Sequence, residues 1–390
     1  MKNNIKGISL IALIITIIVI IILASTTILS FKEGKIVGKA EELALKNDIE
    51  AMKEELHSKV SIEMVDKDET DFNGPAEDFL ETAKKYPGKF KVVNGKLYLV
   101  QDVVTDEEKK AAEDLNVAFT PSVPKGFVAS QATGETDIST GLVIYEGTDV
   151  VNDSNVAAAR ENRNQFVWVP VDDINGFIRQ SFYETSTNNY PPDEEPYSGA
   201  SSSEITEYNA MYESVKKYHG FYIARYEASK DDTTNKAQSK KNKTPLSTIW
   251  GNSMTDLSGG AVEAARAVYP ASQTTTGVVS TLIYGVEWDQ AVRFIEKNYP
   301  GISKDSTGRG NYGTGSIANT GSSDAYAQNN IYDMCGNRWE WTMEPSSSAG
   351  RFYRGGTYGG NGKLFPISTR VIYGPVNQIT NGFRIALYIK

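Results

Sequence analysis

The chain has 390 residues, 40% hydrophobic and 23% charged, which is enough for two or three globular domains with at least one large core. A net charge of −9 argues against nucleic acid as a partner, because phosphate backbones are bound by basic surfaces. One cysteine excludes an intrachain disulfide and a cysteine-only zinc site, and two histidines exclude a histidine-rich metal centre.

The first 60 residues predict one long helix, from about Ile8 to Val60. Residues 7–31 carry no charge, and as a helix they would extend about 37 Å, enough to cross a bilayer core of about 30 Å. We expect the membrane-spanning part at about residues 8–31. An apolar stripe then predicts an amphipathic stalk, with Ile36, Ala40, Leu43, Ile49, Met52, Leu56 and Val60 on one face.

The start of this helix, Lys6–Leu13 (KGISLIAL), resembles the start of type IV pilins and pseudopilins. The resemblance implies cleavage by a prepilin peptidase between Gly7 and Ile8, packing against other pilins, and an extracellular remainder. Two departures are Ile8, where the family has Phe, and Ala12, where it has Glu. They disfavour a major pilin and leave a minor or tip subunit and a simple membrane anchor open.

Residues 61–120 predict a small α+β spacer without chemistry. Pro75–Tyr86 has the spacing of an amphipathic helix. Phe90–Val93 and Lys96–Val100 flank Asn94-Gly95, the pair typical of a type I′ hairpin turn. Thr105, with Glu108 three residues on, predicts the capping box of a short helix.

Residues 121–390 predict a loop-rich α+β domain that begins at the Pro121–Pro124 segment. Strand-like runs are Gly141–Tyr145, Gln165–Val169 and Gly220–Glu227. A helix is expected at Trp288–Ile295. Polar loops are expected at Thr185–Thr206, Asp231–Lys243 and Ser303–Gly321.

The segment Asn330–Trp341 (NIYDMCGNRWEW) holds the only cysteine and two of the five tryptophans. We expect Trp339 and Trp341 to pack in the core, because an indole ring is large and its N–H needs a partner. We expect Cys335 to be a buried, small apolar residue.

Several segments together resemble the formylglycine-generating enzyme, or sulfatase-modifying-factor, family. They are Phe166–Val169, Tyr222–Glu227, Tyr284–Phe294, Asn330–Trp341, Arg354–Tyr358 (RGGTY) and Gly382–Arg384 (GFR). The resemblance covers about residues 121–390 and implies a C-type-lectin-like α+β fold, here on a pilin-like transmembrane and stalk helix.

The resemblance does not extend to the family's catalytic residues. Its two copper-binding cysteines project onto Gly360 and Phe365, and a thiolate is the metal ligand and redox group that the reaction needs. A related branch uses three histidines, which this chain lacks. We therefore expect a protein that is not an enzyme; an enzyme of unknown chemistry is the third option.

The resemblance also implies calcium at the central turn. Its ligands would be the side chains of Asp333 and Glu340 and the carbonyls of Gly336 and Arg338, all oxygen donors of the kind that calcium prefers. The alternative is that Arg351, Arg354 or Arg384 neutralises the two carboxylates.

We therefore expect a cell-surface or pilus-associated binding protein, adhesin-like, whose domain faces outside a bacterial cell envelope. Its ligand would be a glycan or a protein, and the fold resembles variable proteins of diversity-generating retroelements. A structural filament subunit is the second option. Tyr and Asn suit adaptable contact loops. The candidate ligand-binding residues are Tyr358, Asn361, Lys363, Phe365, Ser368, Arg370, Ile372, Tyr373, Asn377, Gln378 and Asn381.

Overall fold

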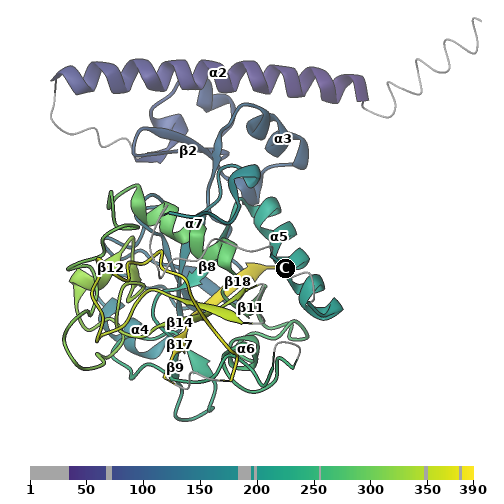
Figure 1. Ribbon diagram of the computed structural model, residues 1–390. Helices are drawn as coiled ribbons and strands as arrows, with labels where there is room; N and C mark the ends of the chain where they lie inside the picture. Colours follow the sequence, from purple (N-terminus) through teal and green to yellow (C-terminus); the bar gives the residue numbers. More distant parts are fainter. Residues whose placement is uncertain are drawn as a thin grey trace, which may run out of the picture. The chain divides into compact units, whose positions relative to one another are not determined.

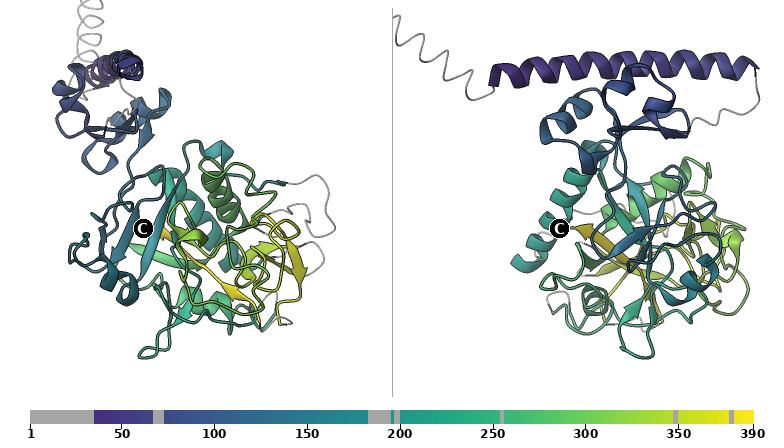
Figure 2. Two further views of the ribbon diagram at one scale, coloured as in Figure 1. Left: turned by 90° about the vertical axis from the view of Figure 1, so that its left-hand side faces the viewer. Right: turned by 180° about the vertical axis from the view of Figure 1, so that it is seen from behind.

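The computed structural model describes residues 35–66, 73–182, 195–196, 200–253, 256–346, 350–376 and 380–390. The chain divides into two compact units, Met1–Ala118 and Phe119–Lys390. The architecture is mixed α and β, with a curled main sheet, few helices and long loops (Figure 1, Figure 2). The expected membrane segment and the Gly7–Ile8 cleavage point lie outside the described residues. Within those residues, no helix has the length and apolar character that a membrane span requires.

The first unit is built on helix α2 (Lys35–Asp66). Leu45, Ile49, Met52 and Leu56 recur at spacings of four, three and four, and all four are buried. The expected stripe was wrong at Ala40, which is exposed, and at Leu43, which is 61% exposed. Ile49 is six residues after Leu43. Over six residues an α-helix rotates by about 240° beyond one full turn, so the side chains of Leu43 and Ile49 lie on different faces.

A small sheet completes this unit, in the order β1 (Gly74–Pro75), β2 (Phe90–Val93), β3 (Lys96–Leu99), β4 (Ala118–Phe119). The predicted β2–β3 hairpin is confirmed, with positive φ at both Asn94 and Gly95. The predicted capping box is also confirmed: α3 (Asp106–Asp114) begins with Thr105 and Glu108 bonded to each other's backbone N–H groups.

The predicted helix over Pro75–Tyr86 is wrong. The chain forms two 3₁₀ turns there, η1 (Ala76–Asp78) and η2 (Thr82–Lys85), and a third, η3 (Gln101–Val103), follows β3. Ala76, Leu80 and Ala83 are nevertheless buried. The apolar spacing was therefore informative, but two short turns satisfy it as well as one helix does.

The second unit contains a six-stranded antiparallel sheet in the order β11-β18-β8-β7-β6-β5. These strands are β5 (Phe127–Ala129), β6 (Val143–Glu146), β7 (Gln165–Pro170), β8 (Gly220–Ala224), β11 (Val278–Leu282) and β18 (Ile385–Ile389). The three predicted strands became β6, β7 and β8. Phe166, Trp168 and Tyr222 are fully buried, so this sheet carries much of the core.

A second sheet has the order β16-β15-β14-β17, where only the β14–β17 pair is parallel. Its strands are β14 (Glu340–Pro345), β15 (Arg351–Arg354), β16 (Val371–Tyr373) and β17 (Gly382–Phe383). Two ribbons pair β9 (Ser229–Lys230) with β10 (Ala237–Gln238) and β12 (Ala327–Gln328) with β13 (Ile331–Tyr332). The central turn thus leads directly into β14.

The predicted helix at Trp288–Ile295 is confirmed as α7 (Gly285–Glu296). The other helices are α4 (Val156–Asn162), α5 (Ser202–Tyr218) and α6 (Ala261–Arg266), with 3₁₀ turns η4 (Ile174–Gly176) and η5 (Asp324–Tyr326). The first residues of α5 fall in what was expected to be a polar loop. Ser201 caps this helix by accepting a bond from the Glu204 N–H, and Met211 and Val215 are buried on its inner face.

Candidate functional site

The central turn folds through residues in left-handed conformations, among them Asn330, Asp333 and Asn337. Gly336, at φ 75°, is required: a Cβ there would lie 2.5 Å from the carbonyl oxygen of Asn311. The backbone of the turn at Gly336 therefore lies in close contact with the backbone of Asn311. This close approach fixes where the side chains on either side of it point.

Three buried carboxylates, Glu227, Asp333 and Glu340, surround the turn, and Arg384 is their cationic partner. Arg384 donates from Nε and Nη2 to both oxygens of Glu340, at 3.0 and 2.6 Å. Glu227 accepts the backbone N–H of Arg338 at 3.0 Å. Arg384 of the GFR motif thus neutralises Glu340 of the Trp-Glu-Trp motif. This is the alternative to calcium that the sequence left open.

Asp333 is the least satisfied of the three carboxylates. Its Oδ2 accepts the N–H of Gly321 at 2.8 Å, whereas Oδ1 is buried with no hydrogen-bond partner among the residues that the structure describes. Burial raises the pKa of Asp333 to about 7. Burial, with Asp333 and Glu340 nearby, also raises the pKa of Glu227 well above its usual range. One arginine against three carboxylates leaves room for a proton or a cation.

The expected calcium ligands are brought together only in part. Glu340 is committed to Arg384, so Asp333 is the side chain of the expected set that retains an unused oxygen. No group of three or more His, Cys, Asp or Glu side chains is arranged to hold a metal within the described part of the chain. Calcium stays a prediction, with Asp333 as its best-fitting side chain.

The structure places Cys335, the two positions onto which the copper-binding cysteines project, and His219; the expectation that Cys335 is buried is confirmed. Cys335 is fully buried, and burial raises the pKa of its thiol to about 12, so it stays protonated at neutral pH. Gly360 and Phe365, onto which the copper-binding cysteines project, do lie side by side: a Cβ at Gly360 would be 3.4 Å from Phe365 Cδ2. His219 ends α5 and stacks on Phe119 at 3.7 Å between ring centroids.

An aromatic patch lies at the surface beside the central turn. We define it as Trp339, Tyr353, Phe365 and Tyr373. Trp339 packs edge-on against Tyr353 at 4.9 Å and Phe365 at 5.4 Å, and Tyr353 contacts Tyr373 at 5.8 Å. Tyr373 is 40% exposed, and Leu364, next to Phe365 in the chain, is 62% exposed. The expectation that Trp339 is a core residue was therefore wrong, whereas the expectation that Trp341 is buried is confirmed.

The predicted ligand-binding residues separate into four groups. Asn361, Lys363 and Tyr373 are exposed, and Tyr358, Phe365 and Ile372 are half-buried. Asn377 and Gln378 lie outside the described residues. Ser368, Arg370 and Asn381 are buried, so the expectation that they face a ligand was wrong. The Ser368 hydroxyl donates to the backbone carbonyl of Ser303 and thereby ties its segment to the segment around Ser303.

A buried ion-pair network lies beneath this segment. It consists of Asp289, Glu344, Arg354 and Arg370, whose side chains are all fully buried. Arg354 donates to Glu344 at 2.7 Å and to Asp289 at 2.9 Å, and Arg370 donates to Glu344 at 2.6 Å and also to Asp289. Burial alone would raise the pKa of Glu344, but Arg179, Arg370 and Arg354 outweigh it and lower that pKa to about 2.

This network ties four separate pieces of chain together: α7, β14, β15 and the segment before β16. It was not predicted from the sequence. The only available signal was Arg354 in the RGGTY motif, and nothing in the spacing of Arg370 distinguishes it from a surface arginine.

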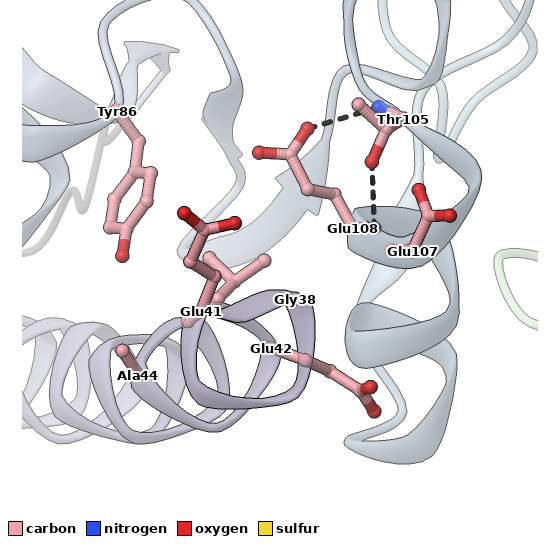
Figure 3. A pocket seen from close by; sticks show the side chains of 9 residues that line it. Gly38, Glu41, Glu42, Ala44, Tyr86, Thr105, Glu107 and Glu108 are labelled. Carbon is pink, nitrogen blue, oxygen red and sulfur yellow. Dashed lines mark hydrogen bonds between the residues drawn. The ribbon is translucent and has the colours of Figure 1, made fainter. Parts of the chain in front are cut away.

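A separate hollow of about 500 Å³ lies within the first unit, beside the start of α2 (Figure 3). Four glutamates line it: Glu41, Glu42, Glu107 and Glu108. Lys46 pairs with Glu42 at 2.8 Å and Lys89 with Glu108 at 2.6 Å. Glu108 also belongs to the capping box of α3, so at least two of these carboxylates serve the structure, and we assign the hollow no ligand.

No protein-family model and no curated protein matches this chain. Among solved structures, it is similar to Treponema denticola variable protein 1, with 14% identity and a TM-score of 0.31, over 57% of this chain and 95% of that one. It is also similar to CarF, with 17% identity and a TM-score of 0.29, over 44% of this chain and 87% of that one. Neither likeness is strong enough to assign a family.

Proposed function

We propose that residues 119–390 form a non-catalytic recognition domain with a C-type-lectin-like fold. It binds a protein or glycan at the cell surface through the aromatic patch. The supporting observation is that partly exposed aromatic rings lie on β15 and the 365–373 segment, which the buried ion-pair network ties together through Arg354 and Arg370. Tyr and Trp give large contact areas with few rotatable bonds, which is why they are enriched where binding energy concentrates.

The chemistry of the second unit supports recognition over catalysis. A thiol with a pKa of about 12 is not a nucleophile, and the two positions of the family's metal-binding thiols hold a glycine and a phenylalanine. The surface formed by Gly360 and Phe365 is instead continuous with the aromatic patch, since Phe365 belongs to both. The position that would hold copper in the enzyme family is thus proposed as part of the ligand surface here.

Presentation on a bacterial cell envelope is the finer part of the proposal. The uncharged segment of residues 7–31 would anchor the chain in the membrane or, after cleavage between Gly7 and Ile8 and together with other pilins, in a pilus. A purified mature chain that begins at Ile8 would support the pilin form, and one that retains Met1 would support the simple anchor. Calcium, held by Asp333, is proposed to brace the central turn.

The proposal is tested by screening the full chain against arrayed glycans and bacterial and host cell surfaces. Leu364→Ser and Tyr373→Ser remove apolar contact area from exposed positions. Val150→Ser is the matched control, because Val150 is 49% exposed and lies outside the patch. We expect Tyr373→Ser, within the patch, and Leu364→Ser, beside it, to lose at least about tenfold in affinity and the control to bind as the wild type does. Equal binding by all three variants would contradict the proposed surface.

A further inference from the structure

A second pocket lies in the same unit but shares no residue with the aromatic patch. Its volume is about 580 Å³, within the range of small-molecule sites. It is lined by the first turns of α5, the end of α6 with the turn that follows, β11 and β18; Figure 1 shows these four elements on one side of the unit. Its walls are mainly apolar, from Ala210, Pro270, Ala271, Val279 and the ring of Tyr388.

Tyr388 gives this pocket an unused hydrogen-bond donor. Its side chain lines the pocket although the residue is only 9% exposed. Its hydroxyl has no hydrogen-bond partner among the residues that the structure describes. Burial, with Glu207 nearby, raises the pKa of Tyr388 to about 12, so the hydroxyl keeps its proton at neutral pH. The hydroxyl is thus a free donor for an acceptor oxygen in the pocket.

Arg266 supplies further donors. Its Nε and Nη2 are paired with Glu207, at 2.7 and 3.0 Å, and Glu207 also accepts the hydroxyl of Tyr284. The ion pair thereby fixes the guanidinium and leaves Nη1 without a partner among the described residues. Arg266 also lines an adjacent hollow of about 390 Å³, so its free edge is accessible.

The N-terminus of α5 supplies the third set of donors. Ser202 and Ser203 are the first two residues of this 17-residue helix, and both line the pocket. The N–H groups of the first helical turn have no acceptor within the helix, and the helix dipole favours negative charge there. The side chain of Ser201 accepts the Glu204 N–H and shares a hydrogen bond of 2.9 Å with the Ser203 hydroxyl, so it takes up neither the Ser202 N–H nor the Ser203 N–H.

We infer that this pocket binds a small monocarboxylate with an apolar body. Tyr388 Oη, Arg266 Nη1 and the first N–H groups of α5 are all donors, so the complementary group is an acceptor with at least two oxygens. Glu207 already offsets the charge of Arg266, which disfavours a dianion such as phosphate. The apolar walls suit a hydrocarbon body, so a carboxylate on an alkyl or aryl group fits both parts of the pocket.

The test uses the full chain and fluorine NMR, with 4-fluorobenzoate and 6,6,6-trifluorohexanoate as probes. The matched neutral compounds are 4-fluorobenzyl alcohol and 6,6,6-trifluorohexanol. Ala210→Leu fills the pocket from an exposed position of α5, and Asn209→Leu is its control, since it is a neighbouring exposed residue that does not line the pocket. Tyr388→Phe removes only the hydroxyl. Urea midpoints confirm that each variant is folded.

We expect saturable line broadening for at least one acid, with a weaker or absent response for its alcohol. Ala210→Leu should abolish this response and Asn209→Leu should preserve it. Tyr388→Phe should weaken acid binding about tenfold, the loss typical of one hydrogen bond to a charged acceptor. The inference is overturned if neither acid binds below about 10 mM, if the alcohols bind equally well, or if Ala210→Leu binds like the wild type. None of these outcomes depends on the aromatic patch, so failure here leaves the proposed recognition surface standing.

Discussion

Replacing Glu344 by Gln tests whether the buried ion-pair network holds the recognition surface in place. The lowering of the Glu344 pKa from 4.5 to about 2 measures how much the arginines favour its ionised form. At about 1.4 kcal/mol for each unit of pKa, that ionisation stabilises the folded state by about 3 kcal/mol. Removing one partner of a buried ion pair typically costs about 3–5 kcal/mol, so two independent arguments give a similar loss.

The assay is urea denaturation followed by tryptophan fluorescence at pH 7. All five tryptophans lie in the second unit, so the signal reports this unit alone. Glu213→Gln is the control, because Glu213 is 69% exposed and its nitrogen partner, Lys216 Nζ, is 3.9 Å away. We expect a loss of about 3–5 kcal/mol for Glu344→Gln and of less than about 0.5 kcal/mol for the control.

The pH dependence gives a second check on the same variant. Because the folded-state pKa of Glu344 is lowered, its stabilisation is complete above pH 4.5 and disappears as the pH falls toward 2. The difference between wild type and Glu344→Gln should therefore be constant from pH 7 to 5 and shrink below pH 4.5. A difference under about 1 kcal/mol at pH 7, or one that stays unchanged down to pH 3, would refute the reasoning.

Three further predictions concern single buried positions. Burial raises the pKa of Glu287 to about 8. Wild-type stability should therefore fall by up to about 4 kcal/mol as the pH rises from 4.5 to 8. Glu287→Gln should remove this pH dependence, measured by urea titrations at pH 5 and 8. Gly336→Ala should cost at least about 1 kcal/mol more than Gly315→Ala, since both have φ near 75° but only Gly336 faces a backbone oxygen, that of Asn311; equal losses would contradict this. If calcium binds at Asp333, added calcium should raise the melting temperature of the wild type and leave Asp333→Asn unchanged; no calorimetric heat in the wild type would exclude the site.

Local signals in the sequence predicted local structure well. The Asn94-Gly95 turn and the Thr105 capping box need only neighbouring residues, and both formed as expected. The amphipathic run at Trp288 predicted α7 for the same reason. The exceptions were local too: the spacing over Pro75–Tyr86 fitted a helix, yet backbone bonds to residues three positions back gave 3₁₀ turns.

Long-range pairing set the limit of prediction. Arg354 and Asp289 are 65 residues apart, and Arg370 and Asp289 are 81 apart. No periodicity links such residues, and a fully buried arginine has the same sequence signature as an exposed one. For the same reason Ser368 and Arg370 were expected at the surface, and Trp339, expected in the core, is half-buried instead.

The division between exposed and buried residues in the C-terminal segment predicts where this protein tolerates variation. Asn361, Lys363, Leu364 and Tyr373 are exposed, and substitutions at such surface positions usually change stability by less than about 0.5 kcal/mol. Arg370 belongs to the ion-pair network, where a single change should cost about 3 kcal/mol or more. If a diversity-generating retroelement acts on this segment, differences between the gene and its template copy should therefore fall in the codons of the exposed residues and spare that of Arg370. A template whose differences fall as often at Arg370 as at Tyr373 would contradict the view that a fixed, buried network supports a variable surface.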